Sequence, residues 1–174
     1  WFNMEDPLVS GYTAEKVALR RAVQLAYDID REIRIVRRGQ ALAAQAAMPP
    51  GTFGYDASFR SDNGAHDPAR AKALLDLFGY VDRDGDGWRE QPDGQPLLLE
   101  MATQQSAIER QFDENWQKSL AAVGLRVKFV TAQWPENLKS ARAGKLMMWG
   151  VGSTATEPDA QLALEYFYGP SIGQ

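Results

Sequence analysis

Four aspartates between residues 82 and 93 form the pattern in this sequence that comes nearest to a metal site. Asp82, Asp84 and Asp86 lead to Gly87 in the order D-x-D-x-D-G, and Asp93 stands where an EF-hand loop places its last carboxylate. Carboxylate oxygens are preferred calcium ligands. The flanking residues do not indicate a helix pair, and turns rich in glycine and aspartate commonly need no ion. We therefore predict a solvated turn, with calcium as the alternative.

A second chemical pattern is the segment Gly150-Val151-Gly152-Ser153-Thr154-Ala155, which matches the G-x-G-x-x-A form of a dinucleotide-binding turn. It lies between an apolar run at residues 146–152, typical of a covered strand, and a helix expected near Pro158. The full fingerprint requires an acidic residue at the end of a second strand about 20 positions later, and the chain reaches Gln174 first. A dinucleotide-dependent enzyme fragment is therefore a minor alternative.

The composition excludes other chemistry. The 174 residues contain no cysteine, which excludes disulfides, thiolate zinc sites and cysteine nucleophiles. The one histidine, His66, lies in a polar loop with no serine or carboxylate partner in view, so we do not expect a catalytic base. A net charge of -4 gives no general attraction for nucleic acid or anionic lipid. No stretch approaches the roughly 18 apolar residues of a membrane-spanning helix.

The first 66 residues indicate a short strand, a helix and a long irregular connection. Residues 1–5 are expected to form the strand. A helix beginning at Thr13 is predicted to run to Gly39, with residues 41–47 as a short continuation. Its apolar face comprises Ala18, Ala22, Leu25, Ile29 and Ile33. Four arginines near its end are interpreted as a solvated helix face, with attraction of an anionic partner as the alternative: Arg31, Arg34, Arg37 and Arg38.

The remaining residues alternate between helices and strands. Asp67 followed by Pro68 predicts a helix start, and Gly79 its end. Residues 80–96 form a turn-rich excursion. Strands are then expected at residues 97–102, 125–131 and 146–152, and helices at 104–124, 135–144 and from Pro158. The middle helix should bury Ile108, Phe112, Trp116, Leu120 and Val123 in the core. This order predicts an α/β sheet with right-handed crossovers.

Four stretches, in order and spacing, carry a resemblance to a known family. They are residues 2–7, 19–31 (LRRAVQLAYDIDR), 67–80 (DPARAKALLDLFGY) and 149–159, where Trp149-Gly150 precedes Glu157-Pro158-Asp159. In these stretches the chain resembles the peptide and nickel class, family 5, of bacterial extracellular solute-binding proteins. The dipeptide- and oligopeptide-binding proteins of ABC importers form this class.

The resemblance implies a type II periplasmic-binding-protein fold with a mixed sheet flanked by helices. Residues 1–174 would form a single domain, the C-terminal (second) lobe of a two-lobed protein about three times longer. The start at Trp1 agrees with an excised piece. Such a protein would be a monomer in the periplasm, or extracellular and membrane-associated, and would not be an enzyme. Its partners would be its own first lobe, a peptide or small-molecule ligand and a membrane permease, without nucleic acid or cofactor.

Ligands of open α/β sheets bind beyond the carboxyl ends of strands. That rule nominates the residues that end the strand at 146–152 and follow it: Trp149, Gly150, Val151, Gly152, Ser153 and Thr154. Asn3, in the first matching stretch, is a further ligand-binding candidate. In peptide-binding relatives an aspartate in this loop pairs with the ligand's α-ammonium group, and here Ser153 or Thr154 takes its place. A ligand amine should then be missing or be satisfied by the other lobe. A ligand-sensing domain of a regulator is an alternative function.

Overall fold

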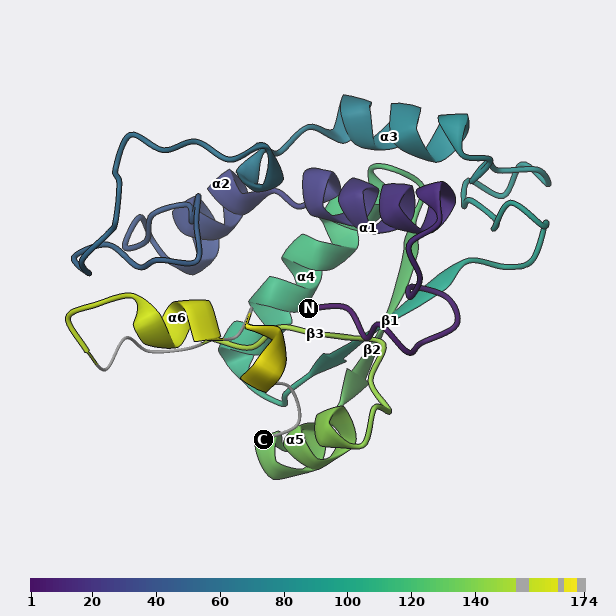
Figure 1. Ribbon diagram of the computed structural model, residues 1–174. Helices are drawn as coiled ribbons and strands as arrows, with labels where there is room; N and C mark the ends of the chain where they lie inside the picture. The colour runs from purple at the N-terminus through teal and green to yellow at the C-terminus, as the bar shows by residue number, and fades with distance from the viewer. Residues whose placement is uncertain (153–156, 166–167, 172–174) are drawn as a thin grey trace.

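A three-stranded parallel sheet lies at the centre of the protein. The structure, a computed structural model, describes residues 1–152, 157–165 and 168–171, without the side chains of residues 162 and 171. The strands are β1 (Leu98–Thr103), β2 (Arg126–Thr131) and β3 (Met148–Trp149), in the order β2-β1-β3 (Figure 1). In the register of the sheet, Ala102 of β1 lies beside Val130 of β2 and beside Trp149 of β3.

The connections between the strands place helices on both sides of the sheet. Helix α4 (Ala107–Ala121) leads from β1 to β2, and α5 (Trp134–Arg142) leads from β2 back past β1 to β3. Because successive crossovers of one hand run in opposite directions here, they place α4 and α5 on opposite faces. Figure 1 shows α5 below the sheet and α4 above it. The predicted α/β order is therefore confirmed from residue 97 onward.

Two further helices complete the core above the sheet. Helix α1 (Ala14–Ala26) packs against α3 (Pro68–Leu77). The start of α3 is as predicted, because the Asp67 carboxylate accepts the Arg70 N–H at 2.9 Å. The core joins buried apolar side chains from these helices, from α4, from the strands and from the loops next to them: Val9, Leu19, Ala22, Val23, Leu25, Ala26, Ala71, Leu75, Tyr80, Leu97, Leu99, Leu120, Val123, Leu125 and Met148. No helix in the described part of the chain is long and apolar enough to cross a membrane.

The helix predicted to reach Gly39 is interrupted. It ends at Ala26, and a short α2 (Ile29–Arg31) and a π-helical turn η1 (Glu32–Val36) follow. The cause is local, because the Asp28 carboxylate accepts the Arg31 N–H at 2.8 Å and so begins a new helix. The Asp28 N–H donates to the Ser119 hydroxyl of α4 at 3.1 Å instead of continuing α1. The predicted helix at residues 41–47 is also wrong, since that segment is irregular.

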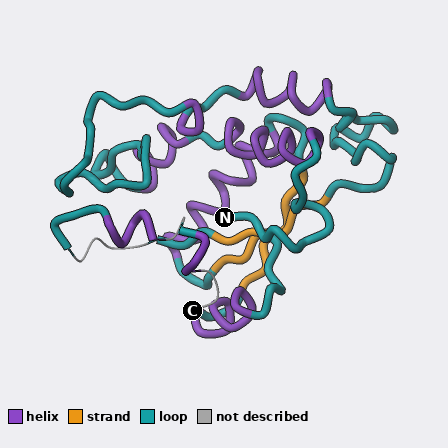
Figure 2. Tube along the Cα trace, viewed as in Figure 1, coloured by secondary structure: helices purple, strands orange, loops and turns teal. Residues whose placement is uncertain are grey.

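The remaining segments lie outside the main helices and strands. Residues 1–5 form no named strand, but Phe2 makes an antiparallel bridge with Met148, so the sheet is mixed at this edge. The long connection contains η2 (Asp62–Gly64), and its Phe53 N–H donates to the Pro158 carbonyl at 2.7 Å beside α6 (Gln161–Glu165). A last turn, η3 (Gly169–Ser171), follows α6. Figure 2 shows the turn-rich excursion at residues 80–96 as loop throughout, as predicted.

Candidate functional site

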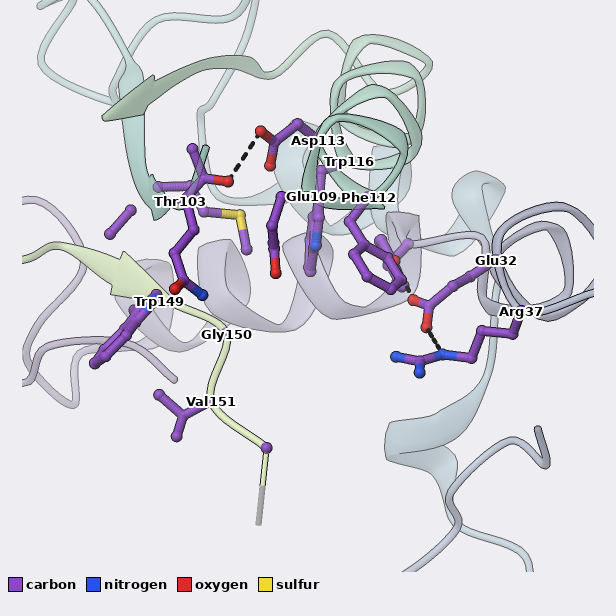
Figure 3. A pocket seen from close by; sticks show the side chains of 15 residues that line it. Glu32, Arg37, Thr103, Glu109, Phe112, Asp113, Trp116, Trp149, Gly150 and Val151 are labelled. Carbon is purple, nitrogen blue, oxygen red and sulfur yellow. Dashed lines mark hydrogen bonds and ion pairs between the residues drawn. The ribbon is translucent and has the colours of Figure 1, made fainter. Parts of the chain in front are cut away.

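A pocket of about 330 Å³ lies where the carboxyl ends of β1 and β3 meet helix α4 (Figure 3). Three segments distant in the sequence surround it: the turn after α1, the end of β1 with the adjoining face of α4, and the end of β3. Its walls comprise Tyr27, Glu32, Arg37, Met101, Ala102, Thr103, Gln104, Glu109, Phe112, Asp113, Trp116 and residues 149–152. We call this the strand-end pocket. Its volume is in the range of small-molecule sites.

One face of α4 forms a wall in which acidic and aromatic side chains alternate. Glu109, Phe112, Asp113 and Trp116 have the i, i+3, i+4, i+7 spacing that places side chains on one side of a helix. The helix begins beside the pocket because the Ser106 hydroxyl accepts the Glu109 N–H at 3.1 Å. Figure 3 shows the four side chains along this wall, with Glu109 projecting toward the middle of the pocket.

Asp113 is the acidic group of this wall that the protein partly withdraws from water. Its carboxylate accepts the Thr103 hydroxyl of β1 at 3.0 Å. Burial raises the pKa of Asp113 above its ordinary value, the Thr103 hydrogen bond opposes that rise, and the nearby Glu109 charge adds to it. The wall therefore contains a carboxylate whose charged form is disfavoured.

The opposite wall is a set of linked groups from the turn after α1. Glu32 is buried and accepts hydrogen bonds from the Tyr27 hydroxyl and from Arg37 Nε, the latter at 2.6 Å. Burial, followed by the Glu32 hydrogen bond, raises the pKa of Tyr27. The Tyr27 ring lies 4.0 Å from the Trp116 ring, and the Arg37 guanidinium lies 5.0 Å from the centre of Phe112. These contacts join the interrupted helix to α4.

The end of β3 supplies the third wall. Trp149 is buried and packs against the Trp134 ring at 5.0 Å, which fixes its orientation. Gly150, Val151 and Gly152 are exposed at the rim. A Cβ added at Gly150 or Gly152 would meet no atom of the described residues within 4 Å, apart from its chain neighbours, so the backbone there is open to a ligand. Ser153 and Thr154 lie outside the described residues.

Asn3 is not brought to the strand-end pocket. Its side-chain amide donates to the Gly144 carbonyl at 2.9 Å, and its side-chain oxygen accepts the Glu5 N–H at 3.0 Å. Its backbone N–H donates to the Met147 carbonyl at 2.9 Å. The bonds to Gly144 and Met147 hold the N-terminal segment against the loop before β3, so Asn3 positions these two segments relative to each other.

The aspartate-rich turn contains a cluster of four carboxylates, but one of the four residues differs from the prediction. Oxygens of Asp82, Asp84, Asp86 and Glu90 lie within 4.8 Å of one another and could hold a cation. Asp93 is not part of this set, and its carboxylate accepts the Gln95 N–H at 3.0 Å. The turn also has internal partners: Asp82 accepts the N–H groups of Gly85 and Gly87 at 2.7 and 2.9 Å.

Calcium binding by this turn therefore remains a prediction. The backbone amides fold the turn around Asp82, and the Arg126 guanidinium lies 2.9 Å from Asp86. Both interactions satisfy carboxylates without an ion, which favours the solvated turn. A calcium-dependent rise in melting temperature that Asp84→Ala removes would identify a bound ion.

Sequence reasoning missed most of the pocket residues on α4 and in the turn after α1. Phe112 and Trp116, predicted to be buried in the core, face the pocket and are only partly buried. Ile108, predicted on the same face, is 49% exposed. Arg37, predicted on a solvated face, pairs with Glu32 in the pocket wall. The usable signal was the acidic and aromatic spacing of Glu109, Phe112, Asp113 and Trp116.

The geometry is that of an α/β domain with a pocket at the carboxyl ends of its strands. The strand-end pocket lies where connections from neighbouring strands leave in different directions, the position at which open α/β sheets bind ligands. The dinucleotide alternative receives less support, because residues 157–160 after the glycine segment are not helical and α6 begins only at Gln161. A dinucleotide-binding turn should open directly into a helix.

Comparison with known proteins gives the family. Residues 1–174 match the family described as bacterial extracellular solute-binding proteins, family 5 Middle, and the chain belongs to this family. Di/tripeptide-binding protein 2 of Pseudomonas aeruginosa (strain UCBPP-PA14) is 31% identical over 81% of the chain, and the dipeptide-binding protein of Escherichia coli (strain K12) is 28% identical over 83%. The chain spans 25% of the length of each, about a quarter.

Solved structures show the same fold. NikA from Brucella suis, crystallised with Fe(III)-EDTA, matches 98% of the chain with a TM-score of 0.78 and 25% identity, over 33% of its own length. An oligopeptide-binding protein, OppA, matches 99% of the chain with a TM-score of 0.81 and 20% identity, over 27% of its length. The fold class and the resemblance predicted from sequence are therefore confirmed.

Proposed function

We propose that this chain is the second lobe of a two-lobed, monomeric periplasmic protein that captures a solute for an ABC importer. Family membership supports solute binding in general. The observation that carries the proposal is the strand-end pocket, which has aromatic side chains in its wall and an exposed rim at residues 150–152. A first lobe closing on that rim would enclose the ligand, as expected for hinge closure around a bound molecule.

The ligand is proposed to be a peptide or another small solute, bound without chemical conversion. Relatives named as di/tripeptide- and dipeptide-binding proteins favour peptides. Solved structures of similar fold hold other molecules: NikA of Brucella suis was crystallised with Fe(III)-EDTA, and an oligopeptide-binding protein of Thermotoga maritima with mannohexaose. Half-buried aromatic side chains such as Phe112 and Trp116 suit ligands of several kinds, since they contribute apolar surface without requiring one hydrogen-bond pattern.

The proposal is tested by ligand screening of the full-length protein. Thermal-shift and calorimetric measurements would use di- and tripeptides first, then metal chelates and manno-oligosaccharides. At least one solute is expected to raise the melting temperature, because a ligand that binds the folded state stabilises it. Chemical turnover of a solute by the intact protein would contradict the binding function.

A glycine substitution connects the binding to this pocket. Gly152→Leu should remove the ligand-dependent rise while leaving the melting temperature of the free protein unchanged, because a side chain at residue 152 meets open space in this lobe. Gly169→Leu is the matched control, since Gly169 also has open space around it but does not line the pocket. Equal ligand affinity in wild type and Gly152→Leu would place the binding site elsewhere.

A further inference from the structure

The charged side chains that line the strand-end pocket do not balance. Glu32 and Arg37 neutralise one another through a 2.6 Å ion pair. Glu109 and Asp113 also line the pocket, and within the described residues neither forms an ion pair with a lysine or arginine. When both are ionised, the pocket carries an excess of two negative charges.

The two carboxylates differ in how well the protein stabilises their negative charge. Glu109 is in the first turn of α4, where a negative charge is favoured by the helix dipole. Asp113 is a full turn further along, where that benefit has faded. It is half-buried, and among the described residues its carboxylate accepts a hydrogen bond only from the neutral Thr103 hydroxyl. Burial disfavours its charged form, so a cation entering the pocket would relieve a cost that the free lobe carries.

Aromatic faces surround the same space. Phe112 and Trp116 alternate with the two carboxylates along α4, and Trp149 lies across the pocket from them (Figure 3). An aromatic face attracts a cation through its ring quadrupole. Phe112 already holds the Arg37 guanidinium in this way at 5.0 Å, and Trp149 is buried against Trp134, which leaves the half-buried Trp116 for a ligand cation. Paired carboxylates among aromatic rings form a site suited to an organic cation.

We propose that this lobe binds a ligand carrying an amine-derived cation, and that Glu109 and Asp113 of α4 receive that cation beside Trp116. The inference rests on the proposed function and specifies the ligand class for the same pocket. It moves the counter-charge from the loop after β3, where Ser153 or Thr154 stands, to the helix on the other side of the pocket. The expectation that a ligand amine must be missing or satisfied by the other lobe then no longer holds.

The test is calorimetry on the full-length protein with four probes that differ in charge. Trialanine supplies a free ammonium group, and N-acetyl-trialanine is the same peptide without it. Mannohexaose is uncharged, and Fe(III)-EDTA is anionic. Trialanine is expected to bind at least about tenfold more tightly than its acetylated form, since a charge-assisted hydrogen bond in a partly buried site has about that effect.

Variants separate the role of α4 from general effects on folding. Asp113→Asn and Glu109→Gln should each weaken trialanine binding about tenfold or more and leave binding of the acetylated peptide unchanged. Glu114→Gln is the matched control, because Glu114 adjoins Asp113 on the same helix but is exposed, pairs with Lys118 and does not line the pocket. Thermal melts confirm that each variant is folded before binding is compared.

Each other outcome has a defined meaning. Equal affinity for trialanine and its acetylated form, or trialanine binding unaffected by Asp113→Asn and Glu109→Gln, would overturn the cation site. Binding of mannohexaose or Fe(III)-EDTA but not of trialanine would also overturn it while leaving solute capture intact. Binding of no probe here and of no solute in the wider screen would contradict both proposals.

Discussion

Asp113 is the residue at which folding and the proposed cation binding make opposite demands. Its carboxylate is partly removed from water and, within the part of the chain that the structure describes, accepts a hydrogen bond only from the Thr103 hydroxyl. Asp113 shares a helix face with Glu109. Burial raises its pKa, so at neutral pH the folded protein holds a charge in a place that disfavours it. If Asp113 served packing alone, its side chain should stabilise the folded protein at neutral pH. The effect of replacing Asp113 on the free energy of unfolding therefore distinguishes a packing role from a binding role.

Replacing Asp113 by asparagine should stabilise the ligand-free protein slightly at pH 7. The raised pKa means that the folded state binds a proton more tightly than the unfolded state does. The resulting stability is fully present below the ordinary aspartate pKa and is lost as pH rises through the raised pKa. Asparagine avoids that loss, so the advantage of Asp113→Asn should shrink as pH falls and disappear below the ordinary aspartate pKa. Urea denaturation at a series of pH values measures it.

A lower free energy of unfolding for Asp113→Asn at pH 7 would contradict this account. Such a result would mean that the Thr103 hydrogen bond to the ionised carboxylate outweighs its desolvation. The other titratable groups that line the pocket are Tyr27, Glu32, Arg37 and Glu109. Repeating the series with Glu109→Gln would show how much of the effect depends on the neighbouring charge.

At the scale of elements, one face of α4 packs into the core and another face lines the strand-end pocket. Leu120, Asn115 and Ser119 are buried toward the core and α1, and the Asn115 side chain donates to the Asp28 carbonyl at 3.0 Å. Glu109 and Trp116 belong to the pocket face. The segment after α1, to which α4 is bonded through Asp28, therefore also forms the pocket wall opposite α4. This anchoring fixes the width of the pocket.

The central strand β1 should dominate the stability of the sheet. Leu99 is fully buried between its neighbours, whereas Leu98 on the other face is 38% exposed. Leu99→Ala is expected to lower the free energy of unfolding by about 2–5 kcal/mol through lost burial and a residual cavity. Leu98→Ala, the control in the same strand, should cost less than about 1 kcal/mol. Chemical denaturation measures both, and similar losses for the two would show that the face assignment is wrong.

At the scale of the whole molecule, the pocket is formed by segments that only the sheet topology brings together. Residues 27–37, 101–116 and 149–152 meet because β1 lies between β2 and β3 and the crossover helices leave on opposite faces. The rim at residues 150–152 is exposed in this lobe. In the proposed two-lobed protein, side chains of the first lobe would cover that rim and complete the binding site.

The isolated lobe should therefore bind its solute more weakly than the full-length protein. The affinity is expected to fall by at least about tenfold, or about 1.4 kcal/mol, because the isolated lobe covers the ligand from one side only. Calorimetry of the lobe and the full-length protein with the same peptide makes the comparison. Equal affinities would mean that one lobe holds the whole site, which would contradict the closure mechanism.

Much of the fold was predictable from local signals. Asp67 and Pro68 mark the start of α3, and Gly124, at φ +78°, follows α4 in a conformation that favours glycine. The alternation of Val127 and Phe129 with charged residues identifies β2. The interruption after Ala26 was missed because the apolar spacing continues through Ile29 and Ile33. The helix is interrupted where the Asp28 carboxylate caps a new helix and the Asp28 backbone bonds to Ser119 and Asn115 of α4.

The sequence by itself determined the order of elements, the family resemblance and the candidate rim at residues 149–152, because caps, periodicity and strand ends are local properties. Tertiary structure alone decided that Glu32 and Arg37 face Glu109 and Asp113 across one pocket. It also decided that Glu90, rather than Asp93, completes the aspartate-rich turn. Helical periodicity shows which residues share a face, but whether that face meets core, solvent or cavity depends on what the rest of the chain packs against it.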